Sequence, residues 1–328
     1  MFEVDTLLIF SCWAGPMLWS PLSEMHNIGR IPIYLFTLFL YIVLQVPIVL
    51  ATNFGMLLAF RFITGFVGSP VLATGIATVA DIYAPKKRAY GLTICSAFAI
   101  CAPAMGPVVG GFAAHAKGWR WTIWELTWLG GFTIILLFFF FPETSSSNIL
   151  YRRAVRLRKA TGDERPKSMS EIEGENMSGR EIATIMLVRP FTLNFQEPIV
   201  LLLNLYIGLI YAIFYLWFES FPVVFVGIYH FKEQFLGLAF LGILGGILVT
   251  IPAFFYYLYD VQEKMFDKNG KIKPEKRMIV AIVGSFFIPV GLLWFGWTSR
   301  PNIHWIVPIL GSALSPVAGI LVFVSFIL

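Results

Sequence analysis

Charged residues are scarce in this chain, and their scarcity narrows what the protein can be. Asp, Glu, Lys and Arg make up 13% of its 328 residues, about half of the ~25% usual in soluble globular domains. Hydrophobic residues make up 58%, and the mean hydropathy is +0.77. The apolar residues stand in long blocks rather than being spread along the chain, which excludes a pair of ordinary soluble domains.

Cysteine and histidine are also few, and their placement argues against disulfides and metal sites. Each of the three cysteines lies inside an apolar block, where a free buried thiol is the expected state. The four histidines are scattered without the spacing of metal ligands. We therefore expect no metal and no other cofactor.

Several other signatures are missing. The N-terminus, Met1–Asp5, is acidic, whereas a signal peptide starts with positive charge, so we expect the first apolar block to be a genuine span. The stretch Gly242–Gly246 lacks the Lys-Ser/Thr of a phosphate loop, and no ATP binding is expected. No nucleophile-and-base arrangement is present, so we expect no enzyme. The net charge of +5 comes from basic residues between apolar blocks, which does not indicate nucleic acid.

What the chain does have is nine apolar blocks of membrane-spanning length. A helix needs about 20 residues to cross the hydrocarbon core of a bilayer. The expected spans are residues 5–22, 31–51, 55–80, 89–113, 121–141, 197–218, 235–258, 278–298 and 303–327. The sequence thus predicts an all-α membrane protein embedded in the lipid bilayer.

The connections between the spans alternate in positive charge, and this alternation predicts the topology. Lys and Arg gather around residues 30, 86–88, 152–189 and 264–277, whereas the alternate connections hold few. The positive-inside rule places the basic connections in the cytosol, and the Met1 end on the other side.

One connection, residues 142–196, is much longer than the others and rich in Arg, Glu and Ser. Its Tyr151–Lys159 run predicts an interfacial amphipathic helix, and the rest is expected to be partly disordered. We therefore divide the chain into an N-terminal bundle half of five spans (1–141), a cytosolic central loop (142–196) and a C-terminal bundle half of four spans (197–328).

A lone arginine, Arg61, stands about seven residues into the third expected span. An arginine in mid-membrane costs roughly 2.5–3.5 kcal/mol on insertion scales. One alternative is that its side chain snorkels to the interface. Charges inside a membrane face cavities by default, however, and this favours a functional role.

Four charged residues are expected on the cytosolic side of the first half: Glu24, Arg30, Asp81 and Glu143. Such a cluster could latch an inner gate and break when two bundle halves rock against each other. The alternative is a solvated surface cluster worth under about 1 kcal/mol. Position alone does not decide between the two.

The fourth span carries a proline between glycines, at Gly106, Pro107, Gly110 and Gly111. Proline removes a helix hydrogen bond, and the glycines allow another helix to approach closely. From physical chemistry alone, a kinked packing site and a functional bend are equally favoured.

The sixth span carries polar and aromatic residues at helical spacing, at Asn204, Tyr211, Tyr215 and Glu219. Aromatic rings with one amide and one carboxylate suit an adaptable cavity for flat apolar or cationic molecules. An interfacial aromatic belt is the alternative.

At these residues the chain resembles the major facilitator superfamily. Within that superfamily it is similar to the fungal 12-span drug:proton antiporters, above all to exporters linked to benomyl, caffeine and azole resistance. Pro21–Arg30, Arg61–Gly65 and Ala102–Gly111 resemble the signatures of the loop after the second helix, of the fourth helix and of the fifth helix. The resemblance covers essentially the whole chain.

The resemblance implies roles for these residues. The helix with Arg61 would line the central pathway, and Arg61 would take part in proton coupling by biasing the protonation of a nearby carboxylate. The charges at Glu24, Arg30, Asp81 and Glu143 would latch the cytosolic gate. The bend at Pro107 would favour antiport by preventing leak.

The resemblance also implies that nine of twelve transmembrane helices are present, because the first span corresponds to the family's second helix and the ninth to its tenth. Such folds are built from two six-span halves. We therefore expect the sequence to be a fragment, a truncated gene model or a decayed gene.

The resulting expectation is a secondary active transporter in the plasma membrane. It would export small apolar or cationic drugs and xenobiotics by proton antiport with alternating access, so that its partners are small drug-like molecules and protons. Two alternatives stay open, namely a polyamine or nutrient transporter of the same fold and a non-transporting truncated remnant.

Overall fold

The computed structural model describes residues 2–163, 165–175, 184, 188–267 and 272–327, and every regular element within these residues is a helix. Eight helical segments are long and apolar enough to cross a membrane. They are Arg30–Val49, Phe54–Ile82, Arg88–Lys117, Trp119–Phe140, Pro198–Ile228, Gln234–Met265, Glu275–Thr298 and Ile306–Ile327. They coincide with eight of the nine expected spans, although two extend further, to Ile228 and Met265. The predicted all-α membrane fold is confirmed.

The first expected span, residues 5–22, lies within helix α1 (Phe2–Glu24). Its 23 residues are enough to cross the hydrocarbon core at about 1.5 Å per residue. It is not among the eight helices that satisfy both the length and the composition of a span within the described residues. Two prolines, Pro16 and Pro21, lie inside it.

The chain forms two compact units. The first comprises Met1–Ile82 and Ile123–Pro198, and the second comprises Tyr83–Thr122 and Ile199–Leu328. The segment Tyr83–Thr122, which lies in the predicted N-terminal half, packs mainly on C-terminal helices. The division into bundle halves at 1–141 and 197–328 stays a prediction.

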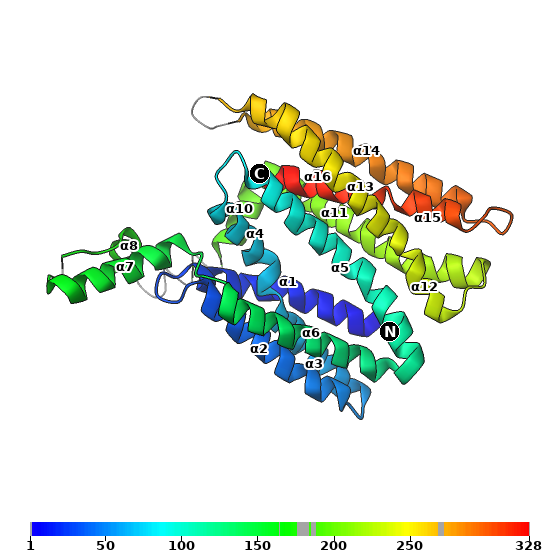
Figure 1. The fold of residues 1–328 in the computed structure, drawn as a ribbon, viewed down its shortest axis with the longest axis horizontal. Coiled ribbons are helices and arrows are strands. Elements are labelled where there is room, and N and C mark those ends of the chain that lie inside the picture. Colours follow the sequence, from blue (N-terminus) through cyan, green and yellow to red (C-terminus); the bar gives the residue numbers. More distant parts are fainter. Residues whose placement is uncertain (1, 164, 176–183, 185–187, 268–271, 328) are drawn as a thin grey trace. The chain divides into compact units, whose positions relative to one another are not determined.

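In the first unit, α1 packs along α3 (Phe54–Gly68) and α4 (Pro70–Ile82), with α2 (Arg30–Val49) beside them (Figure 1). Helix α6 (Trp119–Phe140) joins α2 and α3 through an apolar core. The core consists of Ile48, Val49, Leu57, Phe60, Ile123 and Trp124. Helix α3 begins where it does because the Asn53 side chain accepts a hydrogen bond from the Met56 N–H at 2.7 Å.

The described residues of the long connection include helices α7 (Ser146–Thr161), α8 (Met169–Glu175) and α10 (Arg189–Gln196). The predicted helix over Tyr151–Lys159 is present in α7, which begins at a Ser145 cap and ends at Gly162 with φ of 69°. In Figure 1, α7 and α8 lie beyond one end of α2 and α6. Residues 176–183 and 185–187 of this connection lie outside the described residues. The partial disorder expected for the connection and the interfacial position of α7 stay predictions.

An ion pair joins α7 to α8. Arg158 Nη1 lies 2.9 Å from Glu171 Oε1. The hydrogen bond from Arg158 holds the pKa of the Glu171 carboxyl below its usual value.

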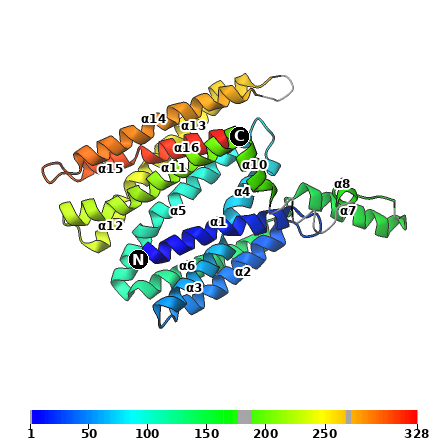
Figure 2. The same cartoon turned by 180° about the vertical axis from the view of Figure 1, so that it is seen from behind.

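In the second unit, α14 packs along α16, and α5 packs against α12, α13 and α16; the same helices are seen from behind in Figure 2. A core forms where Ile210, Ile288, Ala318 and Val322 meet. The helices of this unit are α5 (Arg88–Lys117), α11 (Pro198–Phe221), π-helix η1 (Pro222–Ile228), α12 (Glu233–Ala239), α13 (Leu241–Tyr257), η2 (Leu258–Gln262), η3 (Glu263–Met265), α14 (Pro274–Thr298), α15 (Ile306–Ser312) and α16 (Ser315–Ile327).

Candidate functional site

Three of the four predicted gate charges come together in the first unit. Arg30 Nη2 lies 2.7 Å from Asp81 Oδ2, and the Arg30 side chain is 7% exposed against 38% for Asp81. Within the described residues, two further nitrogens of the Arg30 guanidinium, Nε and Nη1, are buried without a hydrogen-bond partner. Losing the Asp81 contact would therefore leave a buried charge unpaired.

The third member, Glu143, contacts the backbone at the start of α2. Its carboxylate accepts hydrogen bonds from the N–H groups of Arg30 at 3.1 Å and Ile31 at 3.4 Å. It also accepts from the N–H groups of Thr144 and Ser145, each at 3.1 Å. A helix N-terminus has unsatisfied N–H groups and a partial positive charge, so this carboxylate stabilises the start of α2.

Gly29 makes this arrangement possible. Its φ of 81° and ψ of −180° lie in a region that is essentially open only to glycine. A Cβ at this position would lie 2.6 Å from Glu143 Oε2 and 3.0 Å from Asn148 Cγ. In the Gly29-Arg30 pair of the loop signature, the backbone conformation thus requires the glycine, and the ion pair with Asp81 requires the positive charge of the arginine.

The fourth predicted member, Glu24, ends α1 and is exposed. It takes part in none of the ion pairs recorded for the described residues. The structure thus brings together Arg30, Asp81 and Glu143, and it leaves Glu24 outside their contacts.

Arg61 lies in α3, and its side chain is half-buried. Its Nε is buried and has no hydrogen-bond partner in the described part of the chain. The next residues on its helix, Thr64 and Gly65, are buried, and the Thr64 hydroxyl donates to the Arg61 carbonyl at 3.0 Å. A partly buried guanidinium in a membrane helix can pair with a carboxylate, and the role of Arg61 in proton coupling stays a prediction.

In the second unit, the motif around Pro107 packs against a glycine. Pro107 lies inside the continuous helix α5. Gly237 of α12 packs against it, so that a Cβ on Gly237 would overlap the Pro107 carbonyl oxygen and lie 2.8 Å from the Val108 Cα. Gly106 faces open space, and a Cβ on Gly110 would meet only the Thr122 methyl, at 3.8 Å. Gly111 is half-buried in the same helix. The close approach of α5 and α12 therefore depends on Gly237, which the sequence motifs did not single out.

Helix α11 presents three distinct faces in the second unit. One face is buried and contains Ile210, Trp217 and Phe221. A second face is exposed and purely aliphatic, with Leu202, Leu205, Leu209 and Leu216. The third contains the predicted stripe, in which Asn204, Tyr211, Tyr215 and Glu219 are exposed. The residue between them on this face, Gly208, has nothing within 4 Å of a Cβ, and the Tyr211 ring packs edge-on against Phe323 of α16, with centroids 5.1 Å apart.

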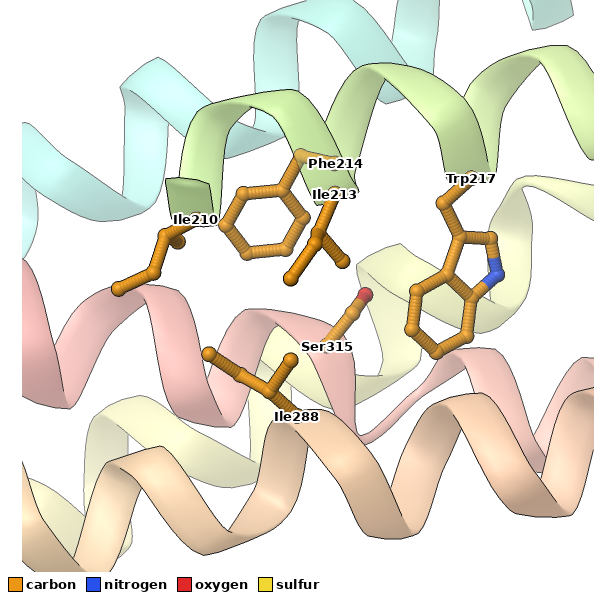
Figure 3. Close-up of a pocket in the computed structure, with 6 residues that line it drawn as sticks. All are labelled: Ile210, Ile213, Phe214, Trp217, Ile288 and Ser315. Atoms are coloured by element: carbon orange, nitrogen blue, oxygen red, sulfur yellow. The ribbon is translucent and has the colours of Figure 1, made fainter. Parts of the chain in front are cut away.

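A small hollow lies where α11, α14 and α16 meet (Figure 3). Its walls are apolar apart from the Ser315 hydroxyl and the indole N–H of Trp217. The other lining residues are Ile210, Ile213, Phe214 and Ile288. The empty volume is about 190 Å³ even when space open to solvent is counted. Drug-sized ligands occupy roughly 300–1,000 Å³, so the hollow belongs to the packing of the helices and not to a substrate cavity.

One polar cluster was missed by the sequence-based prediction. Lys87 Nζ lies 2.6 Å from Glu263 Oε1, and the Tyr90 hydroxyl donates to the same oxygen at 2.7 Å. This contact joins the start of α5 to η3 within the second unit. The charge pattern had placed Lys87 and residue 264 on the same predicted cytosolic side, but it gave no signal that would pair Lys87 with Glu263.

Comparison with known proteins identifies the family of the chain. Residues 4–328 match the sequence profile of the Major Facilitator Superfamily. The chain is 43% identical to "Transporter mfs1" of Schizosaccharomyces pombe over 98% of this chain and 60% of that protein. It is 44% identical to "Multidrug transporter FLR2" of Candida glabrata over 90% of this chain and 50% of that protein.

Among solved structures, the human organic anion transporter MFSD10 (TETRAN) shares the fold, with a TM-score of 0.58 and 16% identity. The match covers 99% of this chain and 68% of that structure. The chain thus spans between half and 60% of the length of the two fungal relatives.

Proposed function

Since this chain belongs to the major facilitator superfamily, we propose that it exports small apolar or cationic drug-like molecules in exchange for protons. It is a multi-pass membrane protein of a transporter family rather than an enzyme. The name of the fungal relative "Multidrug transporter FLR2" supports drug export as the activity. We place the protein in the plasma membrane and take the proton gradient, not ATP, as its energy source.

The observation that carries this proposal is the three-faced helix α11. A membrane helix that packs on one side and shows leucine to lipid on another has no need of a third, polar face. An exposed amide, two tyrosines and a carboxylate would be costly in hydrocarbon, and such residues face a water-filled cavity by default. Tyr211 and Tyr215 offer ring faces to flat molecules, and Glu219 offers a charge to cationic ones.

Arg61 is the proposed proton-coupling residue. A guanidinium beside a carboxyl group lowers the pKa of that carboxyl, so movement of the two apart during transport would raise the pKa and take up a proton, and their approach would release it. The buried Nε, which has no partner among the described residues, supports this role, because it leaves a donor available to a carboxylate.

The Arg30–Asp81 ion pair is the proposed latch of the cytosolic gate, with Glu143 fixing the end of α2 that carries Arg30. Exchange of the two charges, Arg30→Asp with Asp81→Arg, tests the latch. We expect each single variant to lose transport and the double variant to regain part of it. Equal loss in all three would show that the pair does not act through its mutual attraction.

Transport itself is best tested in proteoliposomes that hold the 328-residue chain and a fluorescent lipophilic cation. We expect movement of the dye to follow an imposed pH gradient, to stop when a protonophore removes the gradient, and to be indifferent to ATP. The absence of any gradient-dependent movement by correctly inserted protein would overturn the proposed function.

Arg61→Ala then tests the coupling role. We expect dye transport driven by the pH gradient to be abolished while the amount of inserted protein stays unchanged. Arg300→Ala is the matched control, because Arg300 is an exposed arginine in a connection. Gradient-driven transport that survives Arg61→Ala would remove the arginine from the coupling mechanism.

Polyamine transport is the second candidate, and the exposed Glu219 on the α11 stripe favours it. Competition decides between the two: excess spermidine should block dye transport by a polyamine carrier, and Glu219→Gln should relieve that block. An exporter of apolar drugs should be insensitive to spermidine.

A further inference from the structure

The span Phe54–Ile82 is broken in the middle, between α3 and α4. Helix α3 ends at Gly68 and α4 begins at Pro70, with Ser69 between them in αR conformation (φ −68°, ψ −25°). Proline has no N–H and its ring crowds the carbonyl four residues earlier. At Pro70 this is the carbonyl of Phe66, which therefore loses its normal helix partner.

Two side chains donate to the carbonyl that proline leaves open. The Ser69 hydroxyl donates to the Phe66 oxygen at 2.8 Å, from within the same span. The indole Nε1–H of Trp19 donates to it at 3.1 Å, from α1. The serine alone gives this carbonyl a partner, so the tryptophan contributes something beyond satisfying it, namely a link between helices.

The contact between α1 and the break is close and is shaped for it. A Cβ on Gly15 would overlap the Ser69 hydroxyl and would lie 2.5 Å from the Phe66 oxygen. The Trp19 ring also packs against the Phe66 ring, with centroids 6.1 Å apart. One turn of α1, from Gly15 to Trp19, is thus fitted to the break in the neighbouring span.

The break between α3 and α4 lies between two charged residues of the candidate site. Arg61 lies on the α3 side, and Asp81, the partner of Arg30, lies near the far end of α4. The α4 side is anchored separately, because the Tyr34 and Thr78 hydroxyls share a buried hydrogen bond of 3.0 Å. A change of angle at Ser69–Pro70 would move Arg61 and Asp81 relative to each other.

We propose that Trp19 is a positioning residue, whose indole N–H fixes the bend at Pro70 and thereby the placement of Arg61 relative to the Arg30–Asp81 ion pair. The proposal rests on the proposed transport function for its consequences, but the bend itself can be measured without transport. It makes a specific prediction about Pro70, since without the proline the helix can continue regularly through this point and leaves no bend for the indole to fix.

The transport test is a double-mutant cycle. Trp19→Phe keeps an aromatic ring and removes the donor, and we expect the maximal rate of gradient-driven transport to fall roughly two- to tenfold, the effect of one neutral hydrogen bond. In a Pro70→Ala background the same change should have little effect. An equal loss in both backgrounds would overturn the proposal, because Trp19 would then act through ring packing alone. Trp297→Phe, a change at an exposed tryptophan, is the matched control and should leave the rate unchanged.

The bend is tested separately with spin labels at Ile63→Cys and Ile82→Cys, two exposed positions on either side of the break, after the native cysteines are replaced by serine. We expect Trp19→Phe to broaden the distribution of label distances and Pro70→Ala to narrow it, with Trp297→Phe as control. Unchanged distributions in both variants would overturn the proposal. If the chain transports nothing, the proposed function fails, and the label distances still decide whether Trp19 fixes the bend.

Discussion

Replacing Gly29 by alanine should destabilise the protein more than backbone strain alone explains. The φ of 81° and ψ of −180° at Gly29 cost a residue with a Cβ about 1–3 kcal/mol. The new Cβ would also lie 2.6 Å from Glu143 Oε2 and would push the carboxylate away from α2. Losing the 3.1 Å bond from the Arg30 N–H to this carboxylate adds about 1.5–3 kcal/mol, the value for a hydrogen bond to a charged group.

Gly118 provides the matched control. Its φ of 83° and ψ of 168° are almost those of Gly29, and a Cβ there would meet nothing within 4 Å. Gly118→Ala therefore carries the backbone strain without the clash. We expect the apparent unfolding temperature in detergent, followed by loss of the monodisperse peak after heating, to fall for both variants and clearly further for Gly29→Ala.

A second comparison isolates the carboxylate. In a Glu143→Ala background there is no carboxylate to displace, so the extra cost of Gly29→Ala over Gly118→Ala should shrink to what the 3.0 Å approach to Asn148 Cγ contributes. If Gly29→Ala is no worse than Gly118→Ala in the unmodified chain, the Glu143 carboxylate does not occupy the start of α2, and its capping role is refuted.

Three other outcomes follow from single contacts. Gly237→Ala should lower both stability and transport, because its Cβ would overlap the Pro107 carbonyl. Gly245→Ala is the control and should change neither, because a Cβ there has open space. Thermal unfolding and dye transport measure the two effects. Because the pKa of Glu171 is lowered by its arginine partner, the α7–α8 contact should be constant above the usual pKa of a carboxyl group and should weaken as the pH falls through the lowered value. Hydrogen exchange of residues 146–175 across that range should show the loss, and Glu171→Gln should remove the pH dependence. Gly208→Ala should fit without loss of stability, since a Cβ there meets nothing within 4 Å, and should raise the KM for bulky dyes if the α11 stripe lines the substrate cavity.

Much of the fold could be predicted because membrane helices are recognisable by the length and purity of their apolar runs. The expected spans coincide with eight membrane-capable helices, since within hydrocarbon a backbone has few ways to satisfy its polar groups other than a helix. The ends were less predictable. The span that starts at Pro198 continues as a π-helix to Ile228, past the expected end at residue 218, because Pro222 changes the hydrogen-bond pattern without ending the helix.

The candidate site could be predicted only as far as the residue types allow. Arg30 and Asp81 were placed on one side by topology, and they do form an ion pair. Glu143 was assigned to the same cluster as a charge, whereas its contacts are with backbone N–H groups at the start of α2. Hydropathy and charge patterns describe side chains, so they contain no information about which backbone groups lack a partner.

Proline is the exception, because it identifies such a backbone group from sequence alone. Each proline inside a span leaves the carbonyl four residues earlier without its N–H. Two Ser-Pro pairs show the local solution: the Ser69 hydroxyl donates to the Phe66 oxygen at 2.8 Å, and the Ser315 hydroxyl donates to the Ser312 oxygen at 2.8 Å. A serine before the proline can thus satisfy the carbonyl within one span. Where a side chain from another helix donates as well, as Trp19 does, the carbonyl already has a partner. The additional hydrogen bond then fixes the position of the two helices relative to each other. In this chain the pattern is a Ser-Pro pair in one span facing a glycine and a tryptophan one turn apart on the neighbouring helix.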